Sequence, residues 1–346
     1  MNHLVPERDD GGASEVVFLL LGEPALEKLA GLEPDAAPGE FRRGERAWIL
    51  QTFLHLRRAG HPVRLGAELP ERGLVVYHAK QRREVARLPG RRRDVVLVAV
   101  RGDLRPVRRA AFEIVQCGGA ADGRRAFAMP HWTQPGLRPR DPARGDRVER
   151  VAFKGFAGNL HPQLRGPGWR RTLAERGFEW VEDATEFTPL GALAPLAWED
   201  FSGIDALVAL RPAARLLGRD KPPSKLVNAW LAGVPAILGP EPAFRELRRS
   251  PLDYLEAATP EEALSALERL RADPGLCRAM VENGRMRARD YSRETLVARW
   301  AELLFATLPE RLGAGDPHPG RAVWGRRLSG LLDRARSHAS APRGPR

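Results

Sequence analysis

Short runs of apolar residues recur along this chain, and they constrain its fold more than any other feature. They are bounded by polar, helical or Gly/Pro-containing segments and lie at 15–22, 61–65, 73–79, 94–100, 112–117, 148–155, 178–182, 204–210 and 234–238. Buried strands of parallel sheets have this continuous apolar character, because helices cover both faces of such sheets. Helices are expected at 46–60, where Gly60 is the stop signal, and at 167–177. The pattern predicts an α/β fold built on parallel sheets.

The alternation is interrupted once, by a Pro/Gly/Arg-rich segment at 135–147 that is the best candidate for a linker. The 346 residues suffice for two cores of ordinary size. We therefore predict an N-terminal Rossmann-like domain at 1–147 and a second Rossmann-like domain at 148–309. The second domain should end in helices, the first of which begins with the capping-box pair Thr259 and Glu262.

The last segment, 310–346, is rich in Gly, Pro and Arg and is expected to be a loose basic tail. Within it, 319–336 has apolar side chains on one helical face and arginines on the other, as a helix at a membrane surface does. Gly325 and Gly330 weaken such a helix and favour a loose docking arm. Peripheral contact with the inner face of a membrane is therefore one of two interpretations of the tail.

The net charge of +12 has three possible explanations: nucleic-acid binding, attraction to anionic lipid or phosphate, and compositional bias. The arginines are scattered among acidic residues, without zinc-finger spacing or an aromatic RNA-binding signature. These observations favour a solvated basic surface and argue against a nucleic-acid partner. Two cysteines 160 residues apart suit a reducing compartment, and the longest apolar run, 16–21, cannot span a bilayer. We expect a cytoplasmic protein.

The stretch "KPPSKLVNAWLAGVPAIL", residues 221–238, points to a binding site. Two prolines precede a helix, for which Ser224 is the expected N-cap and Gly233 the stop. Unpaired N–H groups and the helix dipole attract phosphate at such an end, where Lys225 would add a positive charge. Asn228, one turn deeper on the same face, could hydrogen-bond hydroxyl groups.

An ordinary capped helix with a surface lysine is the alternative explanation of this stretch. This alternative is less favoured because further polar residues lie near the same helix end, namely Asp220, Lys221, Asn228 and Glu241. Ligands of open α/β sheets bind beyond the carboxyl ends of strands, which is where this helix begins. The sequence therefore favours a phosphate and sugar site.

Other candidate site residues follow predicted strands. His78 ends one strand and could lie near an acceptor, although a satisfied loop histidine is as good an explanation. Arg101 could bind phosphate and Asp103 could orient a hydroxyl, or the two could form a surface ion pair or turn. Three residues follow strands of the second domain and are assigned to phosphate, namely Lys154, Gly155 and Arg211. His131, at the crossing between the domains, could face the cleft or cap the linker, and no Asp-x-Asp motif predicts a metal.

The region from Asp220 onward resembles bacterial glycosyltransferases of the GT-B fold, particularly family four (group 1). In that family a Glu, seven residues and a second Glu precede a small-residue helix end and a "GxPVI" strand. Here Asp220 and Asn228 hold the two Glu positions and "AWLAGVPAIL" follows, with Gly233 at the family's glycine. The segment 259–285 is similar to the family's closing region, and 42–63 is similar to its N-terminal loop and helix, with Gly44 at the loop position.

The resemblance implies two Rossmann-like domains that face a cleft and a hexosyltransferase that uses a nucleotide-sugar donor, without cofactor or metal. It places the donor phosphates near Gly44, Arg101, Lys154, Gly155, Arg211, Ser224 and Lys225, the ribose or sugar near Asp220, Asn228 and Glu241, and catalysis at His78 and Asp103. It also implies retention of the anomeric configuration. The acceptor, which could be a glycan, a lipid or a small molecule, cannot be read from the residues. A non-catalytic GT-B module and a nucleotide-sugar epimerase are the rival interpretations.

Overall fold

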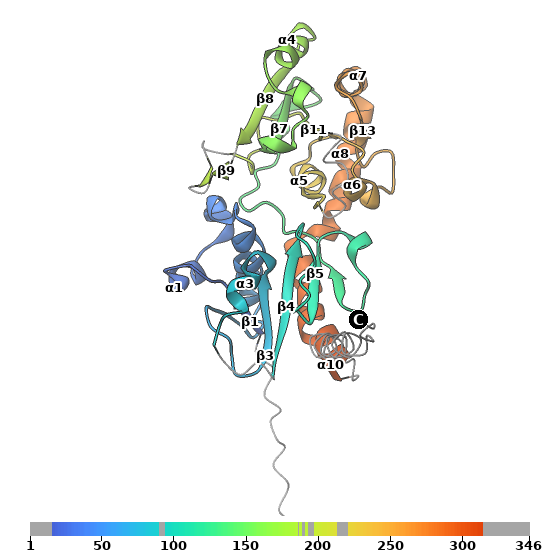
Figure 1. The fold of residues 1–346 in the computed structure, drawn as a ribbon. Coiled ribbons are helices and arrows are strands. Elements are labelled where there is room, and N and C mark those ends of the chain that lie inside the picture. The colour runs from blue at the N-terminus through green and yellow to red at the C-terminus, as the bar shows by residue number, and fades with distance from the viewer. Residues whose placement is uncertain are drawn as a thin grey trace, which may run out of the picture.

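The computed structural model describes residues 16–89, 94–185, 187–188, 191–192, 197–212 and 221–313. Its two lobes each contain a parallel sheet (Figure 1). The sheet of the N-terminal lobe has the order β2-β1-β3-β4-β5-β6, and its strands are β1 (Val16–Leu19), β2 (Val63–Gly66), β3 (Gly73–His78), β4 (Val95–Gly102), β5 (Phe112–Val115) and β6 (Ala126–Ala128). The register pairs every neighbouring strand in parallel.

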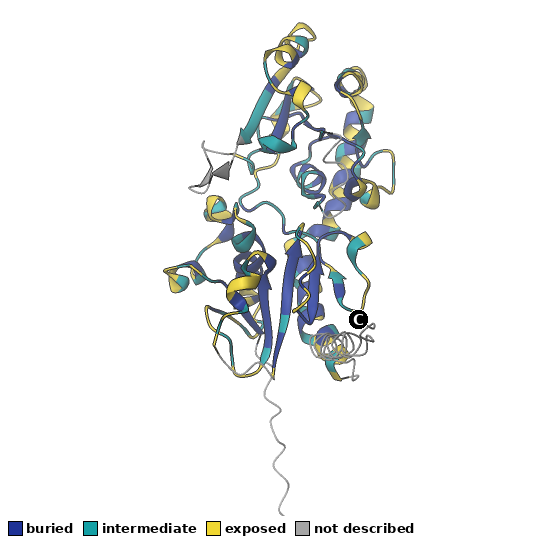
Figure 2. Cartoon of the chain, viewed as in Figure 1, coloured by how far each residue is buried: buried dark blue, intermediate teal, exposed yellow. Residues whose placement is uncertain are grey.

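Alternate residues of these strands enter two different cores, as the period of two requires. On β1, Val16 and Phe18 belong to one core, whereas Val17 and Leu19 belong to the other. The strands β1, β3, β4 and β5 are accordingly buried along nearly their whole length, dark blue in Figure 2, whereas the edge strands β2 and β6 are mostly half-buried or exposed. The helices of this part of the chain are α1 (Leu26–Ala30), the π-helical η3 (Arg46–Leu50), α2 (Gln51–Arg58) and α3 (Arg82–Val85).

The sheet of the C-terminal lobe has the order β13-β12-β11-β7-β8, also fully parallel. Its strands are β7 (Arg150–Phe156), β8 (Glu179–Thr185), β11 (Ala206–Ala209), β12 (Ala236–Leu238) and β13 (Leu255–Glu256). A small antiparallel pair, β9 (Phe187–Thr188) and β10 (Gly191–Ala192), follows β8. The helices are α4 (Pro167–Glu175), α5 (Ser224–Ala232), α6 (Pro242–Leu247), α7 (Pro260–Ala272) and α8 (Pro274–Ala288).

The predicted linker is tied to the C-terminal lobe by one buried carboxylate. Asp205 accepts hydrogen bonds from Arg140 at 2.9 Å, from Arg144 at 2.6 Å and from the Arg150 amide at 2.9 Å. Burial alone would raise the pKa of Asp205, but these hydrogen bonds and charges outweigh it and lower the pKa from 3.8. The segment around Arg140 is thus an anchored part of the lobe.

The final helices return to the N-terminal lobe. They are α9 (Arg293–Glu302), the π-helical η11 (Leu303–Thr307) and α10 (Leu308–Gly313), which run beside the lower sheet in Figure 1. Trp300 is fully buried in the core of that lobe, with its ring centroid 6.4 Å from that of Trp48. The segment 293–308, which lies in the predicted C-terminal domain, therefore packs on the N-terminal sheet.

The predicted fold class is confirmed: two parallel sheets carry helices, and all nine apolar runs contain strands. The strands β6, β9, β10 and β13 were not predicted, because they have only 3, 2, 2 and 2 residues. Thr259 is confirmed as the N-cap of α7, since its Oγ1 accepts from the Glu262 amide at 3.2 Å, whereas the Glu262 carboxylate accepts from the Ala258 amide at 2.6 Å and not from that of Thr259. The tail beyond residue 313 lies outside the described residues, and the domain limits at 147 and 309 stay predictions. Within the described part of the chain, the helices are too short or too polar to cross a bilayer.

Candidate functional site

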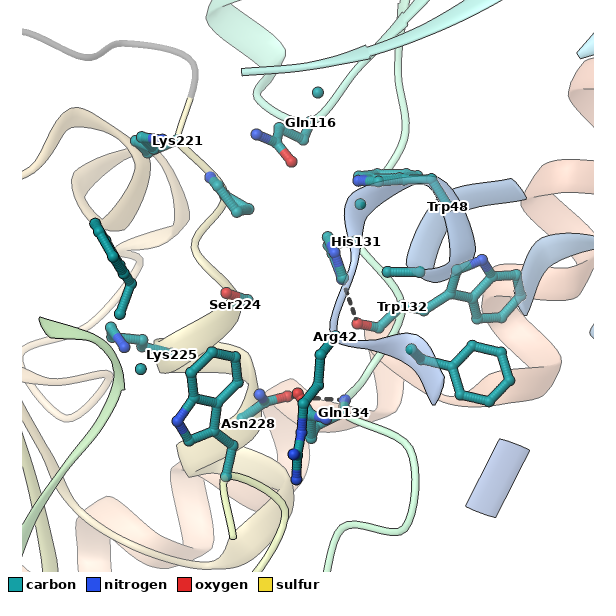
Figure 3. Close-up of a pocket in the computed structure, with 18 of the residues that line it drawn as sticks. Arg42, Trp48, Gln116, His131, Trp132, Gln134, Lys221, Ser224, Lys225 and Asn228 are labelled. Atoms are coloured by element: carbon teal, nitrogen blue, oxygen red, sulfur yellow. Dashed lines mark hydrogen bonds between the residues drawn. The ribbon is translucent and has the colours of Figure 1, made fainter. Parts of the chain in front are cut away.

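A cavity of ≈ 330 Å³ lies between the two lobes. Its wall is made by the carboxyl ends of β3, β4 and β7, the residues after β11 and the first turns of α5. Figure 3 shows Ser224, Lys225 and Asn228 on α5 across from Gln116 and His131. The wall includes eleven of the residues singled out in the sequence: Gly44, His78, Asp103, His131, Lys154, Gly155, Arg211, Lys221, Ser224, Lys225 and Asn228.

The N-terminus of α5 differs by one residue from the predicted cap. Ser224 is the first helical residue, and Pro223 occupies the cap position without a side-chain hydrogen bond. The Pro223 carbonyl accepts the first turn's bonds, from the amides of Leu226 at 3.0 Å and Val227 at 3.2 Å. The prediction of Ser224 as N-cap is therefore wrong, because the chain turns into the helix at Pro223. The stop at Gly233 is confirmed, with a left-handed φ of 67°.

Lys225 places its ammonium at this helix end, next to the cavity. Its Nζ donates to the Lys154 carbonyl and lies 4.6 Å from the ring centroid of Phe153. A side chain at Gly155 would occupy the same space, since an added Cβ would overlap Lys225 Nζ. Among the residues that the structure describes, no carboxylate lies within 4.0 Å of this ammonium.

Burial of the Lys225 ammonium lowers its pKa to about 7, because desolvation disfavours the charged form. The nearby cations Arg211 and Lys154 lower it further, whereas Glu241 and Asp183 act in the opposite direction. The ammonium is thus held at the start of a helix without a contacting counter-charge from the residues that the structure describes. An anion in the cavity would supply that charge.

Two cations near Lys225 in this wall, Lys154 and Arg211, have carboxylate partners. Lys154 Nζ donates to Asp183 Oδ2 at 3.2 Å and to the Ala197 carbonyl at 2.8 Å. Arg211 lies 3.1 Å from Glu241 and donates to Asn159 Oδ1 at 3.2 Å. Lys154 and Arg211 therefore have roles in holding the wall itself, in addition to any contact with a ligand.

Two residues assigned to the site are not part of the cavity wall. Arg101 is buried, with its guanidinium 3.3 Å from the Glu113 carboxylate on β5. Glu241 is buried beside Arg211, and desolvation raises its pKa although Arg211 acts in the opposite direction. Their assigned contacts with phosphate and sugar stay predictions, as does that of Asp220, which lies outside the described residues.

His78 forms the N-terminal wall of the cavity with Gly44. Its Nδ1 accepts from the Lys80 amide at 3.4 Å, and a Cβ added to Gly44 would lie 3.2 Å from its Nε2. Desolvation lowers the pKa of His78 to about 4, to which Lys80 contributes, while Glu45 and Asp103 oppose the shift. His78 is therefore neutral at physiological pH and acts as a hydrogen-bonding group rather than as a cation.

Three contacts join the lobes at one edge of the cavity. The Asp103 carboxylate pairs with Lys221, which precedes α5. Cys117 Sγ lies 3.0 Å from the Lys221 carbonyl, and the Gly118 amide donates to Glu246 of α6 at 2.6 Å. Burial alone would raise the pKa of Asp103, but Lys221 outweighs it and lowers that pKa. Asp103 is thus an ionised group shared between the lobes.

Asn228 and His131 connect the site to the crossing segment. Asn228 Oδ1 accepts from the Gln134 amide at 3.3 Å, the dashed contact in Figure 3. His131 Nδ1 lies 2.7 Å from the Trp132 carbonyl, and its ring meets Trp48 edge-on at 4.8 Å. Desolvation lowers the pKa of His131. The histidine therefore faces the cavity and is also tied to the linker side.

Sequence reasoning missed much of the wall: Arg42, Trp48, Lys80, Gln116, Trp132, Gln134, Phe156, Asn159 and Trp198. Gln116 could have been found, because it follows β5 at the same sheet edge as His78. Arg42 adjoins the glycine-containing loop that was singled out. The linker and loop residues Gln134 and Trp198 carry no periodic signal. Over the described ranges, no three His, Cys, Asp or Glu side chains group closely enough to hold a metal ion.

Comparison with known proteins shows the fold. No protein-family model matches the chain, and no curated protein matches it. Among solved structures, a sucrose-phosphate synthase from Thermosynechococcus elongatus matches with a TM-score of 0.50 and 12% identity, over 87% of this chain and 99% of that one. This likeness, together with the two facing parallel sheets, identifies the GT-B fold.

Two further solved structures are similar over nearly their whole length. AviGT4, a glycosyltransferase involved in avilamycin A biosynthesis, has a TM-score of 0.44 and 17% identity over 87% of this chain and 98% of its own. Anabaena Alr3699/HepE in complex with UDP-glucose has a TM-score of 0.45 and 13% identity over 84% and 99%.

Proposed function

We propose that this chain is a glycosyltransferase that transfers a sugar from a nucleoside-diphosphate sugar to an acceptor. The observation that carries the proposal is the Lys225 ammonium, which lies at the N-terminus of α5 beside an interdomain cavity without a contacting carboxylate among the described residues. A diphosphate would satisfy both this ammonium and the unpaired amides of the first helical turn.

The proposed chemistry uses the same groups. Transfer breaks the bond between the anomeric carbon and the donor phosphate oxygen, and the electron pair stays on the departing nucleoside diphosphate. A bond forms between the anomeric carbon and an acceptor hydroxyl oxygen, and the hydroxyl proton passes to the departing phosphate oxygen. Lys225 and the amide end of α5 would stabilise that charge as it develops. On the opposite wall, the neutral His78 would hydrogen-bond sugar or acceptor hydroxyls, and the ionised Asp103 would orient an acceptor hydroxyl.

Several finer points of the proposal come from the sequence resemblance and the composition. They are membership of family four, a hexosyl donor, retention of configuration, bacterial origin, metal independence and a cytoplasmic location with peripheral membrane contact through the tail. UDP-glucose is bound by the similar HepE structure, so uridine nucleotides are the first donors to test.

The proposal is tested by titrating the purified chain with a panel of UDP-, GDP-, ADP- and TDP-sugars and by measuring release of the nucleoside diphosphate. We expect binding of at least one sugar nucleotide and slow release of its diphosphate even without acceptor. Lys225→Met should weaken binding by roughly 10- to 150-fold and slow the release, whereas Lys28→Met, at an exposed position on α1, should change neither. A wild-type chain that binds no sugar nucleotide would refute the proposal. Binding without release, with every acceptor class supplied, would favour a non-catalytic GT-B module.

A further inference from the structure

Trp198 contributes an aromatic ring to the C-terminal wall of the cavity. Its indole Nε1 donates to the Asp183 carbonyl at the end of β8, at 3.0 Å. Because the indole N–H is committed to this backbone carbonyl, the ring is fixed in orientation and presents apolar surface to the cavity. The side chain is only partly buried, so a ligand in the cavity can reach it.

Lys154 holds this ring segment in place. Its Nζ donates to the carbonyl of Ala197, the residue before Trp198, and to the Asp183 carboxylate. The ammonium also lies 5.1 Å from the ring centroid of Phe201. Phe201 lines the cavity, Ala197 adjoins Trp198, and the Asp183 carbonyl accepts the Trp198 indole N–H, so the side chain of Lys154 is a positioning group for the segment that carries Trp198.

Lys154 also links the Trp198 ring to Lys225, where the phosphate site is proposed. The Lys154 backbone carbonyl accepts from Lys225 Nζ, while its side chain reaches the carbonyl before Trp198. Lys225 therefore lies at the backbone end of Lys154, and Trp198 lies near its ammonium end. Both Lys225 and Trp198 line the same cavity. A nucleoside diphosphate matches this arrangement, because its anionic diphosphate and its aromatic base are separated by a ribose.

We propose that Trp198 is the platform on which the nucleobase of the donor stacks, with the diphosphate at Lys225. This inference rests on the proposed function and assigns the base to a particular wall. Stacking on an aromatic ring tolerates different bases, because every base has a π-face. Trp198 should thus set the strength of nucleoside binding, while choice among bases depends on edge contacts around it.

The test compares UDP with inorganic pyrophosphate, which has the anionic end and lacks the base. Each is titrated against the wild-type chain and against Trp198→Leu, Trp198→Phe and Lys225→Met, with melting curves to confirm that every variant is folded. Leucine keeps apolar bulk and removes the π-face, so Trp198→Leu should weaken UDP by roughly 5- to 150-fold and leave pyrophosphate unchanged. Phenylalanine keeps a π-face and should retain most of the UDP affinity. Lys225→Met should weaken both ligands.

Several outcomes would overturn the inference. UDP affinity unchanged in Trp198→Leu would exclude a stacking role, and equal loss for UDP and pyrophosphate would show that the ring only supports the wall. A loss seen with UDP-glucose and absent with UDP would place the sugar on the ring instead. If the wild-type chain binds neither UDP nor other nucleotides, the proposed function itself fails. If the wild-type chain binds nucleotides and Trp198→Leu binds them equally well, the stacking inference fails while the proposed function stands.

Discussion

Protonation of Lys225 should control how donor affinity depends on pH. Desolvation lowers its pKa to about 7 in the unliganded protein, so a large part of the population lacks the positive charge at neutral pH. A bound diphosphate favours the charged form and raises the pKa of Lys225. Binding must therefore take up a proton whenever the free lysine is deprotonated, and the affinity for the donor must fall as the pH rises above about 7.

The magnitude follows from linkage. Below the pKa of the free protein, the affinity should be nearly constant. Above it, and below the pKa of the complex, the affinity should fall about tenfold per pH unit, since one proton is taken up per ligand bound. His78, with a pKa of about 4, is neutral throughout this range and does not contribute. At pH 6, loss of the charged hydrogen bond in Lys225→Met should cost about 1.5–3 kcal/mol of binding.

Calorimetric titration with UDP-glucose from pH 6 to 9 measures this profile, because the phosphates of that ligand do not titrate near neutrality. Repeating it in buffers of different ionisation enthalpy counts the protons taken up. Lys225→Met should give a flat profile, and Lys28→Met should keep that of the wild type. A wild-type affinity that is independent of pH, or a slope that survives in Lys225→Met, would refute the reasoning.

Three further predictions concern the metal, the ribose contact and the linker. Activity should survive EDTA, and a loss that Mg²⁺ or Mn²⁺ restores would contradict metal independence. Asn228→Glu should keep or tighten nucleotide binding, because a charged acceptor forms a stronger hydrogen bond. Asn228→Leu should weaken nucleotide binding with little change in melting temperature. A sharp fall in the melting temperature of both variants would mean that Asn228 has a structural role. Asp205→Ala should lower the free energy of unfolding by about 3–5 kcal/mol in urea denaturation, since it leaves Arg140 and Arg144 without their carboxylate. Because the pKa of Asp205 is lowered, this stabilisation should be present at pH 7 and lost as the pH falls below 3.8, and an unchanged urea midpoint at neutral pH would count against it.

The strands could be predicted because a buried parallel strand leaves a continuous apolar run, and β3, β4 and β7 all do. The return of α9 to the N-terminal lobe could not, since an apolar helix face shows that a helix is covered and does not show which sheet covers it. Trp300 illustrates this, because its contact with Trp48 depends on how the lobes connect.

Some residues of the candidate site could be predicted from the sequence, and others could not. Residues at the carboxyl ends of strands, such as His78 and Lys154, were found because parallel strands bring those ends to one edge. Arg101 shares that position in the sequence, yet it turns to Glu113, because a strand's neighbours decide which partner a side chain meets. Trp198 lies in a turn, where no periodicity fixes side-chain direction, so only the structure could place it on the wall.

The charge of the cavity wall distinguishes a binding site from a merely basic surface. Lys154, Arg211 and Lys221 each have a carboxylate partner, in Asp183, Glu241 and Asp103 respectively, and are thereby held as parts of the wall. Lys225 differs because its contacts within the described part of the chain are a carbonyl and an aromatic ring, which leave its charge without a contacting carboxylate there. Such a charge destabilises the empty protein through desolvation, and a bound anion removes that penalty. The scattered arginines of a chain with net charge +12 give general attraction to anions, whereas one uncompensated ammonium at a helix end gives a defined place for a diphosphate.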